Sequence, residues 1–236
     1  MTPFMLDSAS QFRSDPPPAL SSREWADAFN EVKAYGAVNS TVRTADQTAV
    51  AKFWNANVIN QYNLAWRDLA GGRSFDLVDT VRLLAMGNMV ASDAGIGCFE
   101  AKYAYAFWRP ITTIRNAGID GNPLTSADAN WSPLLTTPNH PEYPSAHGCL
   151  DGAEGEVFAA VLGTNRIDLD FHGSADGTGG NFAAVRHFEK VNDLDRQIVD
   201  ARTWAGLHYR WSTVQGVVLG RKAAHWILRR FFLPAP

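Results

Sequence analysis

The sequence predicts an all-α protein, and three observations support this fold class. Apolar residues recur at intervals of three and four along most of the 236-residue chain, the spacing that places them on one face of a helix. Alternation of apolar and polar residues is scarce, and no internal repeat is found. Hydrophobic residues make up 46% and charged residues 19% of the chain, a composition typical of a globular domain and not of a disordered chain.

The N-terminal segment is expected to differ from the rest. Residues 1–20 are predicted to form an extended arm, because Pro16–Pro18 cannot supply helical hydrogen bonds and favours polyproline geometry. A first helix should begin at Ser21 or Ser22, either of which can cap it, and end near Gly36. Residues 21–236 are then expected to form a single helical domain.

Two long helical segments are expected in the first half of the domain. One should run from residues 44 to 72, since a single apolar stripe extends through residues 50–69. The other covers residues 75–107, with a break expected near Gly95 and Gly97.

A long loop and three further helices complete the expected fold. Residues 116–144 are rich in Gly, Pro, Asn, Asp and Thr, and a loop this long in a compact domain is usually functional. Helical patterns resume over residues 145–162. A glycine-rich loop spans residues 173–180, another helical run covers residues 181–204, and the last helix covers residues 214–232.

The net charge, the hydropathy and the cysteine spacing of the chain argue against several classes of protein. The formal net charge of -3 attracts neither nucleic acid nor an anionic lipid surface. Residues 83–99 are the most apolar stretch, but they are interrupted by polar residues and too short for a membrane span. The chain as given shows no signal peptide, so a cytoplasmic location is expected. Cys98 and Cys149 lack the spacing of a metal site and do not by themselves indicate a disulfide.

Lys102 and Arg109 are the first pair of candidate site residues. They are seven positions apart, which on one continuous helix places them within roughly 20° of each other. Mostly apolar residues lie between them, so two cations there are costly unless an anion or a carboxylate compensates them. The alternative is a surface helix from which both side chains extend into solvent.

Ser145 and His147 follow a proline-rich segment, where a helix is expected to begin. The free N–H groups of a first helical turn form an anion site with the help of the helix dipole. The Ser145 hydroxyl can supplement that site, and His147 can serve it with a proton. The alternative is that Ser145 only caps the helix and His147 lies on the surface.

Arg202 and His208 form the third candidate pair. Their separation of six residues corresponds to about 240° around an unbroken helix. Both can therefore face one ligand only if the helix ends or bends between them, most simply at Gly206. The alternative is an ordinary packed helix end.

In order, the motifs K-x6-R-P from Lys102, P-S-x-H from Pro144 and R-x5-H from Arg202 resemble the three-part signature of the vanadium-dependent haloperoxidase and type-2 phosphatidic-acid phosphatase superfamily. Residues 92–220 carry the resemblance, and Phe107–Pro110 is more similar to the haloperoxidases than to the membrane lipid phosphatases. The resemblance implies an all-helical bundle that holds vanadate or phosphate. Because the chain is shorter than typical members, N-terminal helices of those members are expected to be missing or replaced by a second copy in a homodimer.

The resemblance also implies a role for each site residue. Three cationic side chains would neutralise the oxygens of the anion: Lys102, Arg109 and Arg202. The Ser145 hydroxyl and the Ala146 N–H would donate hydrogen bonds, and His147 would be the acid–base residue. His208 would bind the vanadium axially, and Lys102 would also polarise the peroxide.

Three functions stay open. The first is oxidation of halide by hydrogen peroxide at bound vanadate. The second is an acid phosphatase, in which His208 attacks a phosphate ester and His147 protonates the leaving group. The third is a phosphate-binding module without turnover. Ala146 replaces the usual Gly, and Ser212 replaces the Asp that usually follows His208 by four. The missing Asp weakens the phosphatase hypothesis unless another carboxylate replaces it, and the sequence does not indicate which.

Halide preference has a weaker signal. Phe99 and His140 occupy positions that, by the same resemblance, line the halide side of the site. A His at the second position is similar to bromide-oxidising members, so bromide is the expected halide.

Overall fold

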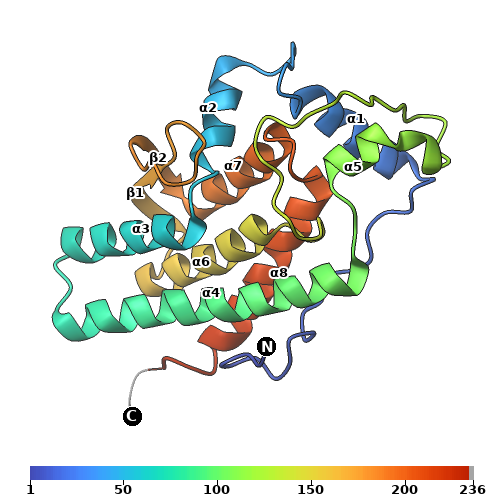
Figure 1. Ribbon diagram of the computed structural model, residues 1–236. Helices are drawn as coiled ribbons and strands as arrows, with labels where there is room; N and C mark the ends of the chain where they lie inside the picture. The colour runs from blue at the N-terminus through green and yellow to red at the C-terminus, as the bar shows by residue number, and fades with distance from the viewer. Residues whose placement is uncertain (234–236) are drawn as a thin grey trace.

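The computed structural model describes residues 1–233 and confirms a mostly helical fold (Figure 1). The helices are α1 (Arg23–Tyr35), α2 (Ala45–Phe53), α3 (Val58–Gly72), α4 (Leu77–Tyr105), α5 (Pro110–Arg115), α6 (Ala146–Leu162), α7 (Val191–Trp204) and α8 (Arg210–Leu228), with a short 3-10 turn, η1 (Ala117–Ile119). The strands β1 (Arg166–Gly173) and β2 (Ala184–Lys190) form one antiparallel hairpin. No helix within residues 1–233 is long and apolar enough to cross a membrane.

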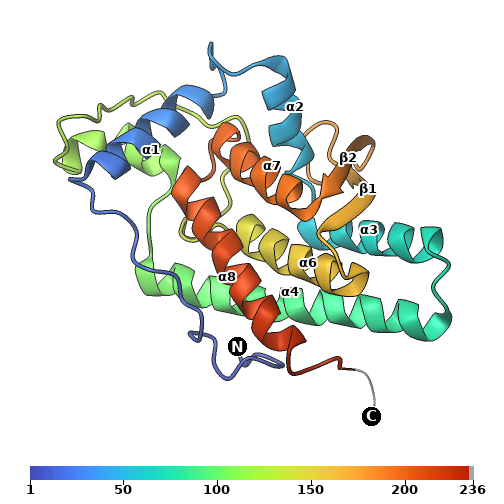
Figure 2. The ribbon, with the colours of Figure 1, turned by 180° about the vertical axis from the view of Figure 1, so that it is seen from behind.

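The centre of the molecule is a layer of α4, α6 and α8, in which α8 crosses α6 (Figure 2). Four glycines let these two backbones approach closely: Gly148, Gly152, Gly216 and Gly220. A Cβ on Gly220 would lie 2.0 Å from the Cys149 carbonyl oxygen, and one on Gly152 would lie 2.3 Å from the Val217 carbonyl oxygen. The close crossing fixes the start of α6 relative to the start of α8.

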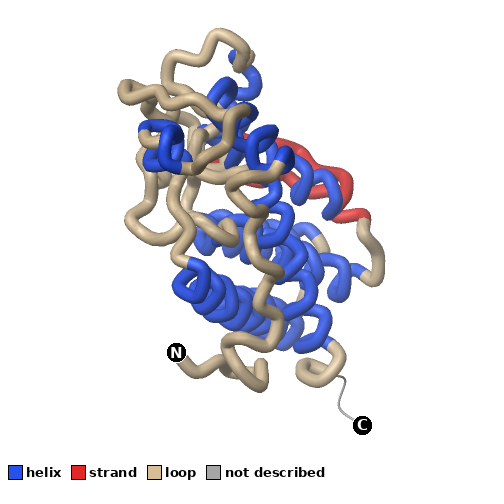
Figure 3. Tube along the Cα trace, turned by 90° about the vertical axis from the view of Figure 1, so that its right-hand side faces the viewer, coloured by secondary structure: helices blue, strands red, loops and turns tan. Residues whose placement is uncertain are grey.

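Two apolar clusters make up most of the core. The larger one joins α2, α3, α4, α6, α7, α8 and the hairpin around buried aromatic residues such as Trp54, Trp66 and Phe171. The smaller one packs α1 against α5 and the segment before α8, around Trp25 and Tyr209. Figure 3 shows the hairpin at one side of the helical layers, and Figure 1 shows it beside α3 and α7.

The predicted helix over residues 181–204 is wrong in its first part, because residues 184–190 form β2 and the helix begins only at Val191. Leu169 of β1 lies opposite Phe188, and Phe188 is buried against Trp54 and Phe171. Long-range pairing between the strands therefore overrides the local helical pattern.

The two helical segments of the first half also differ from expectation. The single predicted helix over residues 44–72 is divided into α2 and α3 by a turn at residues 54–57, where Asn57 caps α3. By contrast, α4 continues without a break through Gly95 and Gly97. A Cβ on Gly97 would lie 3.4 Å from the Ala9 carbonyl oxygen, so the N-terminal segment passes beside the helix at this position.

Residues 1–20 contain no helix or strand, and part of the arm is held on α4. The buried Asp93 carboxylate accepts hydrogen bonds from the N–H groups of Phe4 at 2.7 Å, Met5 at 2.7 Å and Leu6 at 2.9 Å. Met5 and Leu6 are buried in the larger apolar cluster. These contacts fasten the start of the arm to the central helix.

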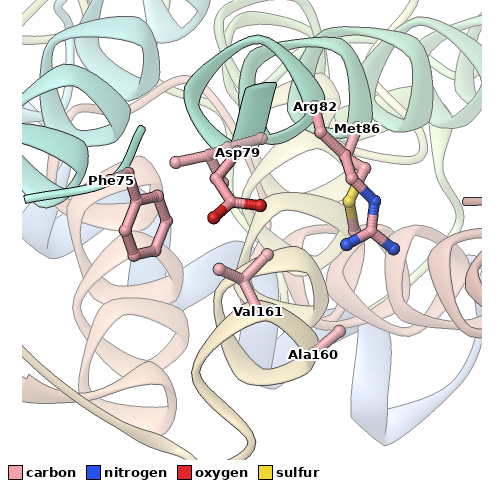
Figure 4. Close-up of a pocket in the computed structure, with 7 residues that line it drawn as sticks. Phe75, Asp79, Arg82, Met86, Ala160 and Val161 are labelled. Carbon is pink, nitrogen blue, oxygen red and sulfur yellow. The ribbon is translucent and has the colours of Figure 1, made fainter. Parts of the chain in front are cut away.

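A cavity of about 270 Å³ lies between the N-terminal end of α4 and the C-terminal end of α6 (Figure 4). Asp79 and Arg82 of α4 line it together with Val161 of α6. None of the predicted site residues lines this cavity, so Arg82 can serve as a comparison residue for tests of the site.

Candidate functional site

Lys102 and Arg109 come together, but not for the reason that the sequence suggested. Helix α4 ends at Tyr105, and Ala106 takes a left-handed conformation with φ 46°. Arg109 is the N-cap residue of the next helix, α5. The two residues therefore do not share one continuous helix, and a turn at the end of α4 directs the arginine back toward the site. Both side chains are buried.

The Lys102 ammonium group is fixed by two backbone carbonyls of the long loop. Its Nζ donates to the Pro141 oxygen at 2.8 Å and to the Glu142 oxygen at 2.9 Å. A lysine ammonium group has three donors, so one N–H is left for a further acceptor. Burial lowers the Lys102 pKa, with the Arg109 charge as an additional cause.

The Arg109 guanidinium connects the loop to the segment after α7. Its Nε donates to the His140 carbonyl oxygen at 3.0 Å, and its Nη1 donates to the Leu207 carbonyl oxygen at 2.9 Å. Nη1 also lies 3.0 Å from His208 Nε2, and Nη2 lies 3.1 Å from His140 Nδ1. This side chain thus links both edges of the site.

Ser145 and His147 lie at the first turn of α6, as the sequence predicts. Ser145 is the N-cap residue and is fully buried, and its hydroxyl accepts from the Gly148 N–H at 3.5 Å, a long hydrogen bond. His147 Nε2 is buried and has no hydrogen-bond partner within residues 1–233. Burial holds the His147 pKa well below its usual value, and the Arg202 charge lowers it further.

Arg202 and His208 meet because the helix between them ends. Helix α7 stops at Trp204, and Gly206 has a φ of 77°, in the left-handed region. Arg202 is buried; its Nη1 donates to the Trp54 carbonyl oxygen at 3.1 Å, while its Nε has no partner in the described part of the chain. Burial lowers the Arg202 pKa to about 9, with Arg109 as the second cause.

His208 has a carboxylate partner that the sequence does not reveal, Glu142. Its Nδ1 lies 2.7 Å from Glu142 Oε1, which also accepts from the Tyr209 N–H at 3.2 Å. Burial raises the Glu142 pKa to about 7, although the Arg109 and Lys102 charges oppose that shift. Glu142 lies between two prolines just before the P-S-x-H motif and residue 212 lacks a carboxylate, but these two facts do not single out Glu142 among the carboxylates of the sequence.

The predicted site residues from the three motifs converge on one place, where the end of α4, the start of α6 and the α7–α8 junction meet (Figure 1). Burial lowers the His208 pKa well below its usual value, and four nearby groups lower it further: Arg109, Lys102, Arg202 and His147. Within residues 1–233 none of the three cationic side chains forms an ion pair with a carboxylate. The site therefore holds more positive than negative charge in a buried environment.

Phe99 and His140 lie together at the outer side of the site. Their ring centroids are 5.2 Å apart, and His140 also contacts Arg109. The Phe99 side chain is partly exposed. Burial, Lys102 and Arg109 lower the His140 pKa to about 4, so this ring is neutral at neutral pH.

The donor set suits an oxyanion and not a simple metal cation. Residues 1–233 contain no group of three or more His, Cys, Asp or Glu side chains that could hold a metal ion. Instead, a helix N-terminus and buried cationic groups provide unused hydrogen-bond donors. Cys98 and Cys149 are buried and free.

Fold and site together define a helical-bundle protein with a buried cationic site that contains two histidines. The chain belongs to the vanadium haloperoxidase superfamily: the family model for the VCPO second helical-bundle domain matches residues 82–232. The sequence resemblance to this superfamily is thus confirmed.

Individual relatives agree with this assignment. The vanadium chloroperoxidase of Curvularia inaequalis is 30% identical over 263 aligned positions, which cover 86% of this chain and 43% of that protein. The vanadium-dependent bromoperoxidase of Ascophyllum nodosum is 29% identical over 100 positions, which cover 36% of this chain and 16% of that protein. A crystal structure of a bacterial vanadium-dependent iodoperoxidase superposes with a TM-score of 0.82 at 27% identity and covers 99% of this chain and 57% of that chain. The chain thus spans about half the length of the chloroperoxidase and of the iodoperoxidase, and its match covers a smaller part of the bromoperoxidase.

Proposed function

We propose that this chain forms the catalytic helical domain of a vanadate-dependent haloperoxidase, which oxidises halide with hydrogen peroxide. The observation that carries the proposal is the convergence of three buried cationic side chains on His208 without an ion-paired carboxylate. Burying such charges is costly unless an anion compensates them. Vanadate is an anion of suitable charge, and the relatives named above are vanadium enzymes.

The residues present fit vanadate. The unused Lys102 N–H and the unpartnered Arg202 Nε are buried donors for its oxygens. Arg109, the Ser145 hydroxyl and the Ala146 N–H would complete the set. When bound, vanadate would supply the metal centre that makes hydrogen peroxide reactive toward halide.

The two histidines would have different tasks. His208 would bind the vanadium through Nε2, because Nδ1 contacts Glu142; Arg109 Nη1, which lies 3.0 Å from Nε2, would then donate to the anion instead. His147 Nε2, buried and unpartnered, would hold or move a proton beside the anion. Its depressed pKa keeps the ring neutral and therefore able to accept a proton.

Bromide is the proposed halide. The Phe99 and His140 pair lies beside Arg109 at the outer side of the site. A neutral His140 ring provides a polar group there without trapping the halide as a strong ion pair. We expect His140→Ala to change the ratio of bromide to iodide oxidation more than it changes vanadate affinity.

A phosphatase is the second candidate, and the contact between Glu142 and His208 favours it. A carboxylate that accepts from Nδ1 keeps Nε2 unprotonated, so that Nε2 could attack phosphorus once Arg109 Nη1 donates to the phosphate instead; this carboxylate would stand in for the Asp that is absent at residue 212. In that case His147 would protonate the leaving group of a phosphate ester. A phosphate-binding module without turnover is the third candidate.

One set of assays separates the three. The protein is supplied with orthovanadate, hydrogen peroxide and bromide, and halogenation of an activated diketone is followed; p-nitrophenyl phosphate is tested without vanadate. Vanadate-dependent halogenation supports the proposal, and ester hydrolysis alone supports the phosphatase. Binding of phosphate with neither activity supports the module.

Variants connect the activity to the site. We expect His208→Ala to lower halogenation by at least about 100-fold, since even the loss of a partner behind a metal ligand typically costs 10- to 100-fold. Arg82→Ala, at the separate cavity, should retain nearly full activity (Figure 4). Equal losses in both variants would show that folding and not the site is being measured.

The homodimer and the cytoplasmic location are predictions that need their own experiments. Exposed apolar residues on the first turns of α4, such as Leu77 and Val78, offer a face that a second copy could cover in a homodimer. Sedimentation equilibrium would test the dimer, and the predicted cytoplasmic location needs a fractionation experiment.

A further inference from the structure

The side chain of Glu142 contacts His208 where the family pattern would have an Asp at position 212. Ser212, four residues after His208, has no carboxylate. The ring of His208 instead contacts Glu142, whose Oε1 lies 2.7 Å from Nδ1. The two residues are 66 positions apart in the chain, so the contact depends on the folded loop before α6.

Glu142 is held firmly enough to position another side chain. Its N–H donates to the Phe107 carbonyl oxygen at 2.9 Å, and its own carbonyl oxygen accepts from Lys102 Nζ at 2.9 Å. Its carboxylate also accepts from the Tyr209 N–H at 3.2 Å, next to the histidine. The residue is fully buried. Backbone and side chain of Glu142 thus fix Lys102 and His208 relative to each other.

The neighbours of His208 determine which nitrogen carries the proton. Nε2 lies 3.0 Å from Arg109 Nη1, and a guanidinium group can only donate. Nε2 must therefore be the unprotonated nitrogen, and Nδ1 carries the hydrogen that Glu142 accepts. The contact with Arg109 and the contact with Glu142 therefore both require the Nδ1–H tautomer of His208, in which the Nε2 lone pair points toward Arg109.

We propose that Glu142 is the positioning residue of His208: its carboxylate holds the ring as the Nδ1–H tautomer and presents Nε2 to the bound anion. This rests on the proposed function in one respect, that His208 bonds to the anion through Nε2. A carboxylate behind a ligating histidine fixes the orientation of the ring and raises its basicity, and loss of such a partner typically costs 10- to 100-fold in affinity.

The first test uses the protein without any anion. Proton NMR of protein labelled with ¹⁵N-histidine should show a downfield, slowly exchanging Nδ1–H of His208 in the wild type. In Glu142→Leu, which fills similar space without an acceptor, this signal should move upfield or exchange rapidly. An unchanged signal in this variant would overturn the proposal, whatever anion the site binds.

The second test compares two anions by titration calorimetry. Orthovanadate can bond covalently to Nε2, whereas inorganic phosphate is held by charge and hydrogen bonds only. We expect Glu142→Leu, which removes the acceptor, to weaken orthovanadate binding by about 10- to 100-fold and phosphate binding by less than about 3-fold. An equal loss for both anions would indicate a structural role alone, and an unchanged vanadate affinity would also contradict the proposal.

A matched control uses Glu154 of α6, a second buried glutamate. Glu154 is buried like Glu142, but its carboxylate contacts Trp66 and no predicted site residue. Glu154→Leu should leave both affinities unchanged. If the wild-type protein binds neither anion, the proposed function fails, and the NMR experiment alone then decides the role of Glu142.

Discussion

Gly206 and Gly36 lie with their backbones in contact, at the point where the chain turns from α7 toward the site. A Cβ on Gly206 would lie 2.5 Å from the Gly36 carbonyl oxygen, and a Cβ on Gly36 would lie 2.5 Å from the Gly206 Cα. This contact places the bend between Arg202 and His208 against the end of α1. The relative position of these two site residues therefore depends on a close approach that side chains would prevent.

We expect Gly206→Ala to destabilise the protein by about 2–5 kcal/mol, from the left-handed backbone and from the clash together. Vanadate affinity should fall as well, because the bend orients His208. Gly121 is the matched control: its φ is 69°, but a Cβ there would meet nothing within 4 Å. Gly121→Ala should cost only about 1–2 kcal/mol and leave vanadate binding unchanged. Urea unfolding and calorimetry measure both effects, and equal costs in the two variants would contradict the role of the contact.

The stability of the protein should depend on pH through Glu154. Its buried carboxyl group accepts from Trp66 Nε1 at 3.2 Å, and burial raises its pKa well above the usual value. The folded state therefore keeps a proton that the unfolded chain loses above about pH 4.5, so the stabilising contribution is present at low pH and is lost as pH rises through the folded-state pKa.

Glu154→Gln should remove this dependence, since the amide stays neutral. At pH 8 the variant should be more stable than the wild type by at least about 1 kcal/mol, or about 2–4 °C in Tm, with little difference at pH 4. Calorimetric melting curves at the two pH values give the result. Glu24→Gln, at an exposed position, is the control for the loss of one negative charge. An equal gain in stability at pH 8 in that variant would show that the burial of Glu154 is not the cause.

The N-terminal arm should loosen when its anchor is removed. Asp93 accepts three backbone N–H groups of residues 4–6, and hydrogen bonds to a charged group are worth more than neutral ones. In Asp93→Ala we expect amide exchange at Met5 and Leu6 to accelerate by at least about 10-fold, which corresponds to about 1.4 kcal/mol of local stability. Asp79→Asn, on the same helix but away from the arm, should leave these rates unchanged.

Local signals predicted the parts of the site that depend on helix ends. The cap at Ser145 was foreseen because a serine follows the prolines at the start of an apolar pattern, and α6 begins at the next residue. The break at Gly206 was foreseen because six residues cannot bring Arg202 and His208 to one face of an unbroken helix. Both predictions needed only the geometry of a single helix.

The features that were missed depend on contacts between distant segments. The strand β2 forms because it pairs with β1 and buries Phe188, a tertiary effect that local periodicity does not contain. Lys102 and Arg109 meet through a left-handed turn at Ala106, where no glycine announces the end of the helix. Glu142 lies in a loop whose path is set by its carbonyl contact with Lys102 and its carboxylate contact with His208.

The crossing of α6 and α8 gives the last prediction. A Cβ on Gly220 would lie 2.0 Å from the Cys149 carbonyl oxygen and 2.8 Å from the Ala153 nitrogen. These are backbone atoms of α6 that cannot turn away, so Gly220→Ala must push the two helices apart. We expect a loss of at least about 3 kcal/mol in urea unfolding, at the upper end of overpacking costs, despite the better helix propensity of alanine.

Gly71→Ala is the control, because Gly71 is also helical and a Cβ there would meet nothing within 4 Å. Alanine should be neutral or stabilising there by up to about 1 kcal/mol. Since the start of α6 carries Ser145 and His147 and α8 follows His208 closely, a wider crossing should also weaken vanadate and phosphate binding together. That joint loss would differ from the selective vanadate loss expected for Glu142→Leu. Intact binding of both anions in Gly220→Ala would show that the crossing does not set the geometry of the site.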